Sequence, residues 1–453
     1  MRKLRLVSLG LAAAVMLTAF VGCGSDSSSS ASSSTASESV QSTDSGSPAK
    51  AVDITFLNSK GEIQSQLEEA AKVFTSENPN IKVEIVPCPT GKSPFEVMST
   101  MYSSGNAPTL AMIDAGDIPR LKDNFIELDG EKWVAEALEG TTNSAKIDGK
   151  LYAFPFAVEG FGFIYNKKVL DEAFGGSFDP NSITTRTALK DAFDKVEKIG
   201  KKALIVSPMD WSMGSHLFSY SYVAAGKGDQ AAYDKMMADL KAGTYDLSSV
   251  PEYNGWLETF DLLKQYNYGK NDPLSVTYEK GPEVLGKGEV GFWFMGNWAW
   301  PQIQEFDSAD KQYGFISYPM SDNSSDFASG KIISFASKFV GIDKKQNSAD
   351  QQEAAKKFLD WIVFENSGQD QLVNKMNLVP AFKNITTPIP DPLGSSIKTA
   401  MGEGKTINAI DVYTVMPADH WAKVGASLQK YLSNNTDKAG LTKEIVEYWK
   451  TVE

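Results

Sequence analysis

The residues best suited to chemistry in this sequence are carboxylates and aromatic rings, and no familiar catalytic motif organises them. Of the 453 residues, 57 are aspartate or glutamate. The sequence has no GxGxxG after a strand, no P-loop, no HExxH and no GxSxG. His216 and His420 belong to no metal-ligand array, so we expect no metal site and no cofactor. A carboxylate-pair glycosidase stays open, because its two carboxyl groups need only lie about 5–9 Å apart in space.

Aromatic residues follow two of the predicted strands. Trp298 stands in FWFMGNWAW, directly after Gly296 and Asn297, and Trp211 stands in SPMDWSMGSH after ALIVS. Ligands bind at the carboxyl ends of strands in open α/β sheets. An indole in that position can stack on the apolar face of a sugar ring while polar neighbours bond the hydroxyl groups. Packing in the core is the alternative for both residues.

The sequence around these residues alternates between strand-like and helix-like patterns. Apolar residues alternate or run together, as in strands, at 52–58, 81–87, 109–114, 203–207 and 289–295. They recur at helical spacing at 62–78, 186–199, 348–366 and 419–450, with the last segment broken near 434–440. Ser348 and Gln351 have the spacing of a capping box. Alternating strands and helices predict an α/β fold with two doubly wound lobes, which the backbone crosses more than once.

Charge and the first 49 residues predict export. The formal net charge of −13 argues against nucleic acid as a partner, because binding a polyanion requires a basic face. The basic start MRKLR and the apolar run after it have the pattern of a signal peptide at 1–22. Phe20-Val21-Gly22-Cys23 resembles the bacterial lipobox, with Phe20 where leucine is preferred. Residues 24–49 are about half serine and predict a disordered tether behind a lipidated Cys23. Cys88 then has no cysteine partner, so we predict no disulfide.

Several segments, taken in order, resemble one family. AVEGFGFIYNKKVLDEA at 157–173 is preceded by GKLYAFPF, and it is similar to a signature of bacterial extracellular solute-binding proteins of ABC importers. The nearest group binds carbohydrates and is typified by maltose-binding protein. SGNAPTLAMID, LGKGEVGFWFMGNWAWPQI and KKFLDWIVFENSGQDQLVNKMNLVPAF resemble further parts of the same family. The similarity covers nearly all of 50–450.

This resemblance implies an organisation and a role. It implies the periplasmic-binding-protein fold, with two α/β lobes, hinge strands and a ligand cleft that closes on a carbohydrate, most simply an oligosaccharide. The expected boundaries are 50–158 plus about 335–392 for lobe 1, about 163–330 plus 395–453 for lobe 2, and hinges near 158–163, 329–335 and 390–400. The implied partners are the carbohydrate, the transmembrane subunits of an ABC permease, and the membrane through Cys23. A monomer at the extracytoplasmic face of the membrane is expected, with no catalysis by the chain itself.

The resemblance also implies ligand-binding residues, which comprise a hinge carboxylate, stacking aromatics and polar groups at strand ends. They are Glu159, Trp298, Asn297, Trp421, Trp211, Asp210, Asp114, Asn58, Ser59 and Lys60. Asn297 replaces a proline of the family, and Ser59 replaces an acidic sugar contact. Ile113 stands where the maltose binders have a tryptophan. A ligand other than maltose is therefore expected.

Three alternatives remain open from the sequence. The same fold could bind a polyamine, an iron complex or a peptide, and the carboxylates of Glu159, Asp114 and Asp210 would suit a cation. An exported carboxylate-pair glycoside hydrolase is a second alternative. A sensory binding protein that reports its ligand to a receptor kinase is the third, and the sequence does not separate it from a transport protein.

Overall fold

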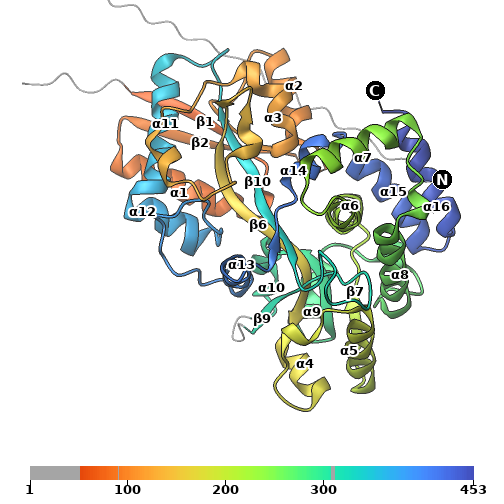
Figure 1. The fold of residues 1–453 in the computed structure, drawn as a ribbon. Helices are drawn as coiled ribbons and strands as arrows, with labels where there is room; N and C mark the ends of the chain where they lie inside the picture. Colours follow the sequence, from red (N-terminus) through yellow and green to blue (C-terminus); the bar gives the residue numbers. More distant parts are fainter. Residues whose placement is uncertain (1–50, 90, 308–311, 453) are drawn as a thin grey trace, which may run out of the picture. The chain divides into compact units, whose positions relative to one another are not determined.

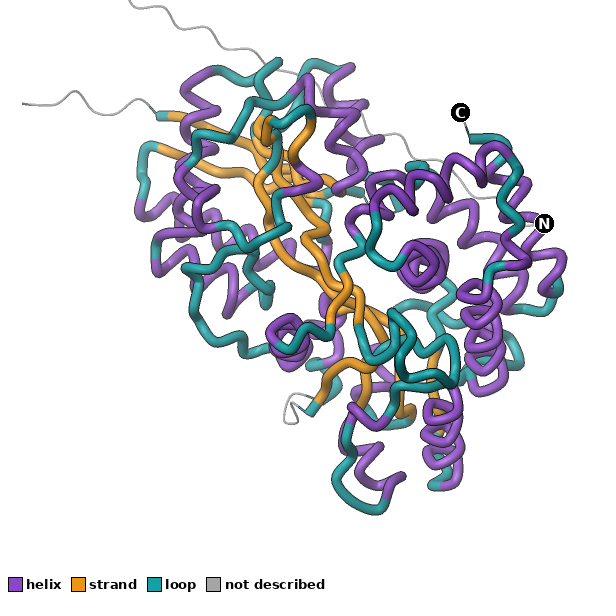
Figure 2. The backbone as a smooth tube through the Cα atoms, in the orientation of Figure 1, coloured by secondary structure: helices purple, strands orange, loops and turns teal. Residues whose placement is uncertain are grey.

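A nine-stranded mixed sheet runs through the protein. Seven strands follow the order β2-β1-β3-β10-β6-β8-β7, and two short strands, β9 and β11, pair with β6 and β10 outside this order. The computed structural model describes residues 51–89, 91–307 and 312–452. The predicted signal peptide at 1–22, the lipidation of Cys23 and the tether up to residue 49 lie outside the described residues. Helices lie on both sides of the strands (Figure 2). The α/β class predicted from the alternating patterns is therefore confirmed.

The first part of the sheet is parallel. Strand β1 (Val52–Asn58) pairs with β2 (Ile81–Pro87) and with β3 (Leu110–Asp114). β3 is almost wholly buried, as its apolar sequence predicts, whereas β2 alternates between buried and exposed side chains. The helices of this part are α1 (Gln64–Glu77), α2 (Pro94–Ser103), α3 (Ile118–Leu121), α11 (Ala349–Phe364) and α12 (Asn366–Asp370). The predicted capping box of Ser348 and Gln351 starts α11.

The second part of the sheet contains the predicted aromatic strand. Strand β8 (Val290–Gly296) is buried along its whole length and pairs in parallel with β7 (Lys202–Ile205). Phe292, Trp293 and Phe294 are core residues, as expected. The helices of this part are α4 (Lys167–Phe174), α5 (Arg186–Lys198), α6 (Phe218–Gly226), α7 (Gln230–Ala242), α8 (Pro251–Tyr266), α9 (Lys280–Gly286) and α10 (Trp300–Ile303).

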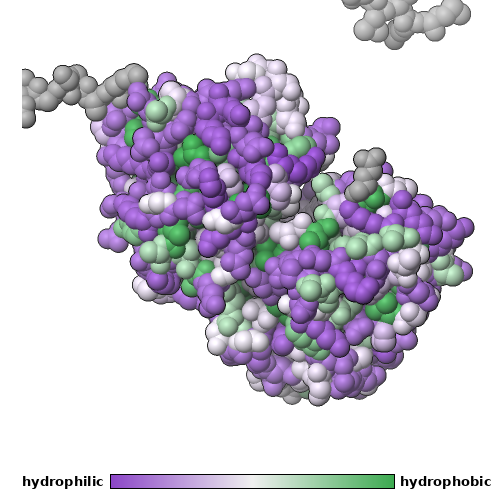
Figure 3. Space-filling model, turned by 45° about the horizontal axis from the view of Figure 1, so that its top comes forward, coloured by the Kyte–Doolittle hydropathy of each residue, from purple (hydrophilic) through white to green (hydrophobic). Residues whose placement is uncertain are grey.

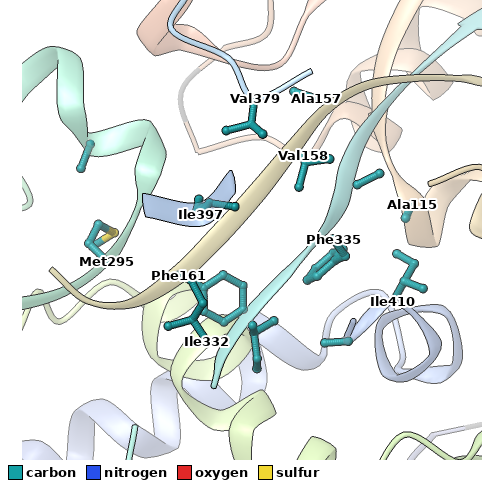
Figure 4. Packing of buried hydrophobic residues seen from close by; sticks show 14 of the residues in the cluster. Ala115, Ala157, Val158, Phe161, Met295, Ile332, Phe335, Val379, Ile397 and Ile410 are labelled. Carbon is teal, nitrogen blue, oxygen red and sulfur yellow. The ribbon is translucent and has the colours of Figure 1, made fainter. Parts of the chain in front are cut away.

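Two long strands join the two parts of the sheet. Strand β6 (Phe154–Asn166) pairs antiparallel with β10 (Ile332–Ile342). On its other edge, β10 pairs with β3 of the first part, and β6 pairs with β8 of the second part. Their register shifts between Ala336 and Phe339. Figure 1 shows the two strands side by side, and Figure 4 shows hydrophobic side chains gathered along them, including Phe161 and Phe335. Antiparallel pairing at this position was not expected from the sequence.

The remaining elements are short or lie near the C-terminus. The short strands are β4 (Lys146–Ile147), β5 (Lys150–Leu151), β9 (Tyr313–Ile316), which pairs with β6, and β11 (Thr406–Ile407), which pairs with β10. The helices are α13 (Pro392–Gly402), α14 (Ile410–Val415), α15 (His420–Leu432) and α16 (Lys438–Trp449). The predicted break near 434–440 thus separates α15 from α16. Trp361 and Trp449 are buried, as expected.

The surface carries few large apolar side chains. Among the described residues, the large hydrophobic side chains that are exposed belong to Leu274 and Phe306. The face drawn in Figure 3 is mostly hydrophilic, with small hydrophobic patches. Among the described helices, none combines the length and the apolar character that crossing a membrane requires.

Candidate ligand-binding site

A buried lysine follows the first strand. The side chain of Asn58, at the end of β1, accepts a hydrogen bond from the Lys60 backbone N–H at 2.9 Å and donates one to the Lys60 carbonyl at 2.9 Å. These bonds fix the turn that carries Lys60. The Lys60 Nζ lies 2.6 Å from a Glu62 oxygen and forms a close ion pair with Glu159. Asn58 was predicted as a ligand contact, but both polar atoms of its side chain bond within the chain. Asn58 therefore positions Lys60.

Glu159 lies on β6 at the centre of a network of charges. Ser337 on β10 donates a hydrogen bond to it, and Lys338, the next residue, forms an ion pair with Asp114 at the end of β3. Burial opposes the ionisation of Glu159, but the charges of Lys60 and Lys338 outweigh it and lower the pKa of Glu159 to about 2. Burial likewise opposes the charge on Lys60, yet Glu159 and Glu62 raise the pKa of Lys60. Glu159 and Lys60 are therefore both ionised across the physiological pH range.

Asn297 and Gly296 hold the tryptophan that follows β8. The Asn297 Oδ1 accepts a hydrogen bond from the Gly160 N–H at 3.0 Å, so this side chain links the turn to β6 beside Glu159. A Cβ atom on Gly296 would lie 2.1 Å from the Trp298 ring. Only glycine therefore lets the Trp298 ring lie back against its own strand, because any side chain there would displace the indole.

Five rings gather beside this turn. The Trp298 ring lies 6.3 Å from that of Trp211, 4.9 Å from that of His216 and 6.4 Å from that of Phe161, between ring centroids. Trp211 also lies 5.8 Å from Tyr278. Trp211, His216, Tyr278 and Trp298 are only partly buried, so ring surface remains accessible to a ligand. We call Phe161, Trp211, His216, Tyr278 and Trp298 the aromatic cluster.

His216 is a neutral member of this cluster. Its Nδ1 atom is buried and has no hydrogen-bond partner among the described residues. Burial disfavours the charged imidazole and lowers the pKa of His216 to about 4, although Glu159 and Asp114 oppose this shift. At neutral pH the ring therefore presents an uncharged face and one unused polar atom toward its surroundings.

The structure brings most of the predicted residues together, but not all of them. Lys60 pairs with Glu159, Asn58 bonds the Lys60 backbone, and Asn297 bonds the backbone of Gly160 next to Glu159. Asp114 pairs with Lys338, whose charge also acts on Glu159. The Ser59 Oγ is buried without a partner among the described residues, which leaves it available to a ligand. Trp211 and Trp298 form the second group, in the aromatic cluster.

Asp210 and Trp421 have other surroundings. The Asp210 carboxylate accepts a hydrogen bond from the Trp211 N–H at 2.9 Å, where the π-helical turn Trp211–Leu217 begins. The Trp421 backbone oxygen packs against Gly214 of that turn. No ring contact joins Trp421 to the aromatic cluster within the described chain. All ten residues remain predictions as ligand contacts, and Asp210 and Trp421 have the weakest geometric support.

Six residues of this region were not predicted from the sequence: Glu62, Phe161, His216, Tyr278, Ser337 and Lys338. The segment IISFASKFVGI is a mainly apolar strand, and Lys338 interrupts that pattern, which was the available signal. His216 was considered only as a metal ligand. Among the described residues, no group of three or more His, Cys, Asp or Glu side chains could hold a metal ion.

Two cavities open near these groups. A cavity of 720 Å³ is bounded by α1, by α10 and by the π-helical turn Gln371–Lys375. Trp300, two residues after Trp298, lines it. A cavity of 380 Å³ is lined by Tyr278 of the aromatic cluster, with Met209, Val276 and Gln429. Open, partly polar space therefore exists beside both tryptophan-bearing turns.

The sheet topology and this site define an α/β binding protein of the periplasmic-binding-protein class. Residues 69–397 match the family of bacterial extracellular solute-binding proteins, and the chain belongs to that family. An uncharacterized ABC transporter extracellular-binding protein of Pyrococcus horikoshii is 23% identical over 271 residues, which are 57% of this chain and 59% of that relative. The match thus spans less than two thirds of the relative's length.

Solved structures show the same fold at low identity. RafE of Streptococcus pneumoniae in complex with raffinose is 18% identical with a TM-score of 0.72, over 88% of this chain and 99% of that one. A chitin oligosaccharide binding protein is 18% identical with a TM-score of 0.70, over 88% and 98%. A sugar transporter of Bacillus licheniformis in complex with stachyose is 19% identical with a TM-score of 0.67, over 89% and 100%. The expected periplasmic-binding-protein fold is thereby confirmed.

Proposed function

We propose that this protein captures a carbohydrate, most simply an oligosaccharide, and delivers it to an ABC permease. The observation that carries this proposal is the aromatic cluster, with Trp211 and Trp298 6.3 Å apart, next to the ionised network of Lys60 and Glu159. Aromatic faces complement the apolar faces of sugar rings, and charged side chains make strong hydrogen bonds to hydroxyl groups. Solved relatives whose names include raffinose, stachyose and chitin oligosaccharide support the same ligand class.

The balance of charge favours a neutral ligand over a polyamine. Glu159 pairs with Lys60, and Asp114 pairs with Lys338, so each carboxylate already has a cation. Glu62 shares Lys60 with Glu159. A cationic ligand would have to compete with the buried Lys60 and the partly buried Lys338. A neutral polyol can instead bond to the outer lone pairs and protons of the two ion pairs without separating them.

Hydrolysis of the ligand is disfavoured by the ionisation of Glu159. A retaining or inverting glycosidase needs one carboxyl group that is protonated at working pH, which requires a raised pKa. The pKa of Glu159 is instead lowered to about 2. Glu159 is therefore unsuited to act as a general acid. Because the chain belongs to a family of solute-binding proteins, we propose that it binds its ligand without catalysing a reaction.

Delivery and anchoring complete the proposal. Residues 50–158 plus about 335–392, and about 163–330 plus 395–453, would form two lobes that close on the sugar about β6 and β10. The chain would act as a monomer, held at the extracytoplasmic face of the membrane by lipid on Cys23. A role as a sensor would use the same closure with a different membrane partner.

A thermal-shift screen of the full chain tests the ligand class. The panel contains sucrose, raffinose, stachyose, chito-oligosaccharides and xylo-oligosaccharides, with spermidine and amino acids as the non-sugar group. A ligand that binds only the folded state at about 1,000 times its Kd stabilises it by about 4 kcal/mol. We expect a shift with one sugar class, and its loss in Trp298→Ala.

Phe306→Ala is the matched control, because Phe306 is an exposed aromatic residue outside the aromatic cluster. This variant should keep the full sugar-induced shift. A shift with spermidine alone would replace the proposed ligand class by a cationic solute. New reducing ends after incubation with the bound glycan, lost in Glu159→Gln, would contradict the proposal that the chain does not catalyse.

A further inference from the structure

The two carboxylates that share Lys60 differ in how far a ligand can reach them. Each oxygen of Glu159 already has a partner in the chain, because Oε1 pairs with Lys60 and Oε2 accepts a hydrogen bond from the Ser337 hydroxyl. The Glu159 side chain is only 10% exposed. The Glu62 side chain is 20% exposed, and within the described chain it bonds to Lys60 through Oε1 and leaves Oε2 free. A ligand can therefore bond to Glu62 without disturbing a buried contact.

The turn Gly61–Ile63 holds the backbone of Glu62 in place. The Ile63 N–H donates a hydrogen bond to the Lys60 carbonyl at 3.1 Å, and the Ile63 side chain is buried in the core. Asn58 bonds the Lys60 backbone on the other side of this turn. Glu62 thus presents its carboxylate from a fixed backbone, which reduces the order that must be gained when a ligand binds.

The Glu62 carboxylate lies close to the aromatic cluster. Burial raises the pKa of the Tyr278 phenol above its ordinary value, and the negative charge of Glu62 raises it further. Glu62 acts on Tyr278 more strongly than Glu279 does, although Glu279 is the next residue along the chain. Because the interaction between charges weakens with distance, Glu62 lies near the Tyr278 hydroxyl. A sugar stacked on the aromatic cluster would therefore have this carboxylate beside its hydroxyl groups.

The sharing of Lys60 leaves Glu62 able to turn to a ligand. A hydroxyl group donates a hydrogen bond to an ionised carboxylate that is roughly twice as strong as one between neutral groups. If Glu62 bonds a ligand, Glu159 still pairs with Lys60, so no buried charge is left alone. Glu159 has no such freedom, because it is the buried partner on which Lys60 depends.

We propose that Glu62, and not Glu159, is the carboxylate that bonds the hydroxyl groups of the sugar. Glu159 is then a positioning residue, which holds Lys60 and through it the turn that carries Glu62. This inference rests on the proposed function, and it names the residue that supplies the charged contact at the same site.

Isothermal titration and urea denaturation of the full chain separate the two roles. The probes are raffinose, stachyose, chitotetraose and xylotetraose, and each one that the wild type binds is titrated into the variants. Glu62→Gln should weaken binding about threefold to tenfold, because a neutral acceptor replaces a charged one, and should leave the urea midpoint nearly unchanged. Glu159→Gln should lower the urea midpoint, while the affinity of the folded protein falls less than in Glu62→Gln.

Two further variants complete this experiment. Glu62→Ala removes the acceptor altogether and should weaken binding about tenfold or more. Glu69→Gln is the matched control, because Glu69 is an exposed carboxylate on α1 that also pairs with a lysine, Lys72. It should change neither the affinity nor the urea midpoint.

The failures of the two proposals differ. Sugar binding that stays within twofold of the wild type in Glu62→Gln and Glu62→Ala would overturn the role of Glu62 and leave the sugar-binding function standing. A larger loss of affinity in Glu159→Gln than in Glu62→Gln would return the contact to Glu159 and also overturn this inference. So would a urea midpoint lowered as far in Glu62→Gln as in Glu159→Gln. No binding of the four probes by the wild type at millimolar concentration would overturn both proposals.

Discussion

At the scale of single residues, the site depends on charges that neutralise one another. Lys60 and Glu159 are both buried, and burial alone would favour their uncharged forms. Mutual attraction and the hydrogen bond from Ser337 outweigh the loss of hydration and keep both groups ionised. The choice of Glu159 as a candidate ligand contact was possible from the sequence, because the family signature surrounds it. Its partners Ser337 and Lys338 were not predictable, because they lie some 180 residues further along the chain.

Removal of the Glu159 charge should destabilise the fold in a pH-dependent manner. Glu159→Gln leaves Lys60 with one partner fewer and should lower the free energy of unfolding at pH 7 by about 3 kcal/mol. The pKa of Glu159 is about 2 when folded, below its ordinary value of 4.5, so its stabilisation is present above pH 4.5 and is lost as the pH falls toward 2. Urea denaturation at pH 7, 4.5 and 3 measures the free energy of unfolding of both proteins. The difference between wild type and variant should become smaller as the pH falls.

Two further variants make this experiment specific. Lys60→Met combined with Glu159→Gln should recover part of the lost stability, because no buried charge is then left alone. Glu127→Gln removes one partner of the exposed ion pair with Lys150 and should have little effect. A gap for Glu159→Gln that stayed constant down to pH 3 would contradict the assigned pKa.

At the scale of elements, the position of Trp211 depends on a close contact between two helical segments. The turn Trp211–Leu217 and α15 pack backbone against backbone at Gly214 and Gly425. A Cβ atom on Gly425 would lie 2.5 Å from the Asp210 backbone, which leaves no room for a side chain. The existence of α15 was predictable from its apolar spacing. Its packing partner was not, because glycine contacts of this kind have no periodic signal.

Gly425→Ala should therefore affect stability and sugar affinity together. The clash should lower the free energy of unfolding by about 1–3 kcal/mol, as other overpacking substitutions do. The displaced Asp210 and Trp211 should also weaken binding of the sugar found in the screen. Gly402→Ala is the matched control, because a Cβ atom there meets nothing within 4 Å. Urea denaturation measures the stability of both variants, and titration measures their sugar affinity. Equal stability and affinity of the two variants would contradict a close contact between Gly425 and Asp210.

At the scale of the whole molecule, two central strands connect the two parts of the sheet. β6 carries the chain away from the first part of the sheet, and β10 carries it back. The interrupted register between Ala336 and Phe339 weakens the ladder at that point, next to Ser337 and Lys338. A hinge at this position would couple closure directly to the charged network.

Closure should be visible as compaction in solution. Saturating the full chain with the sugar that binds should lower the radius of gyration measured by small-angle X-ray scattering, since the two lobes approach each other over the ligand. Trp298→Ala at the same sugar concentration should keep the ligand-free value, because it binds more weakly. An unchanged radius of gyration in the saturated wild type would contradict a closing hinge and would leave sugar binding itself untouched.

Local patterns were enough to predict the α/β class and to place tryptophans just after β7 and β8. They also predicted the strands β1, β2, β3, β7 and β8 and the helices α1, α5, α11, α15 and α16, but not most of the other helices. These features follow from local periodicity and from residue types next to one another, so a linear pattern contains them. The folded structure was needed to show that β6 and β10 pair antiparallel and that Lys338 meets Asp114. Those features depend on contacts between segments hundreds of residues apart, where burial and charge act through space and leave no spacing in the sequence.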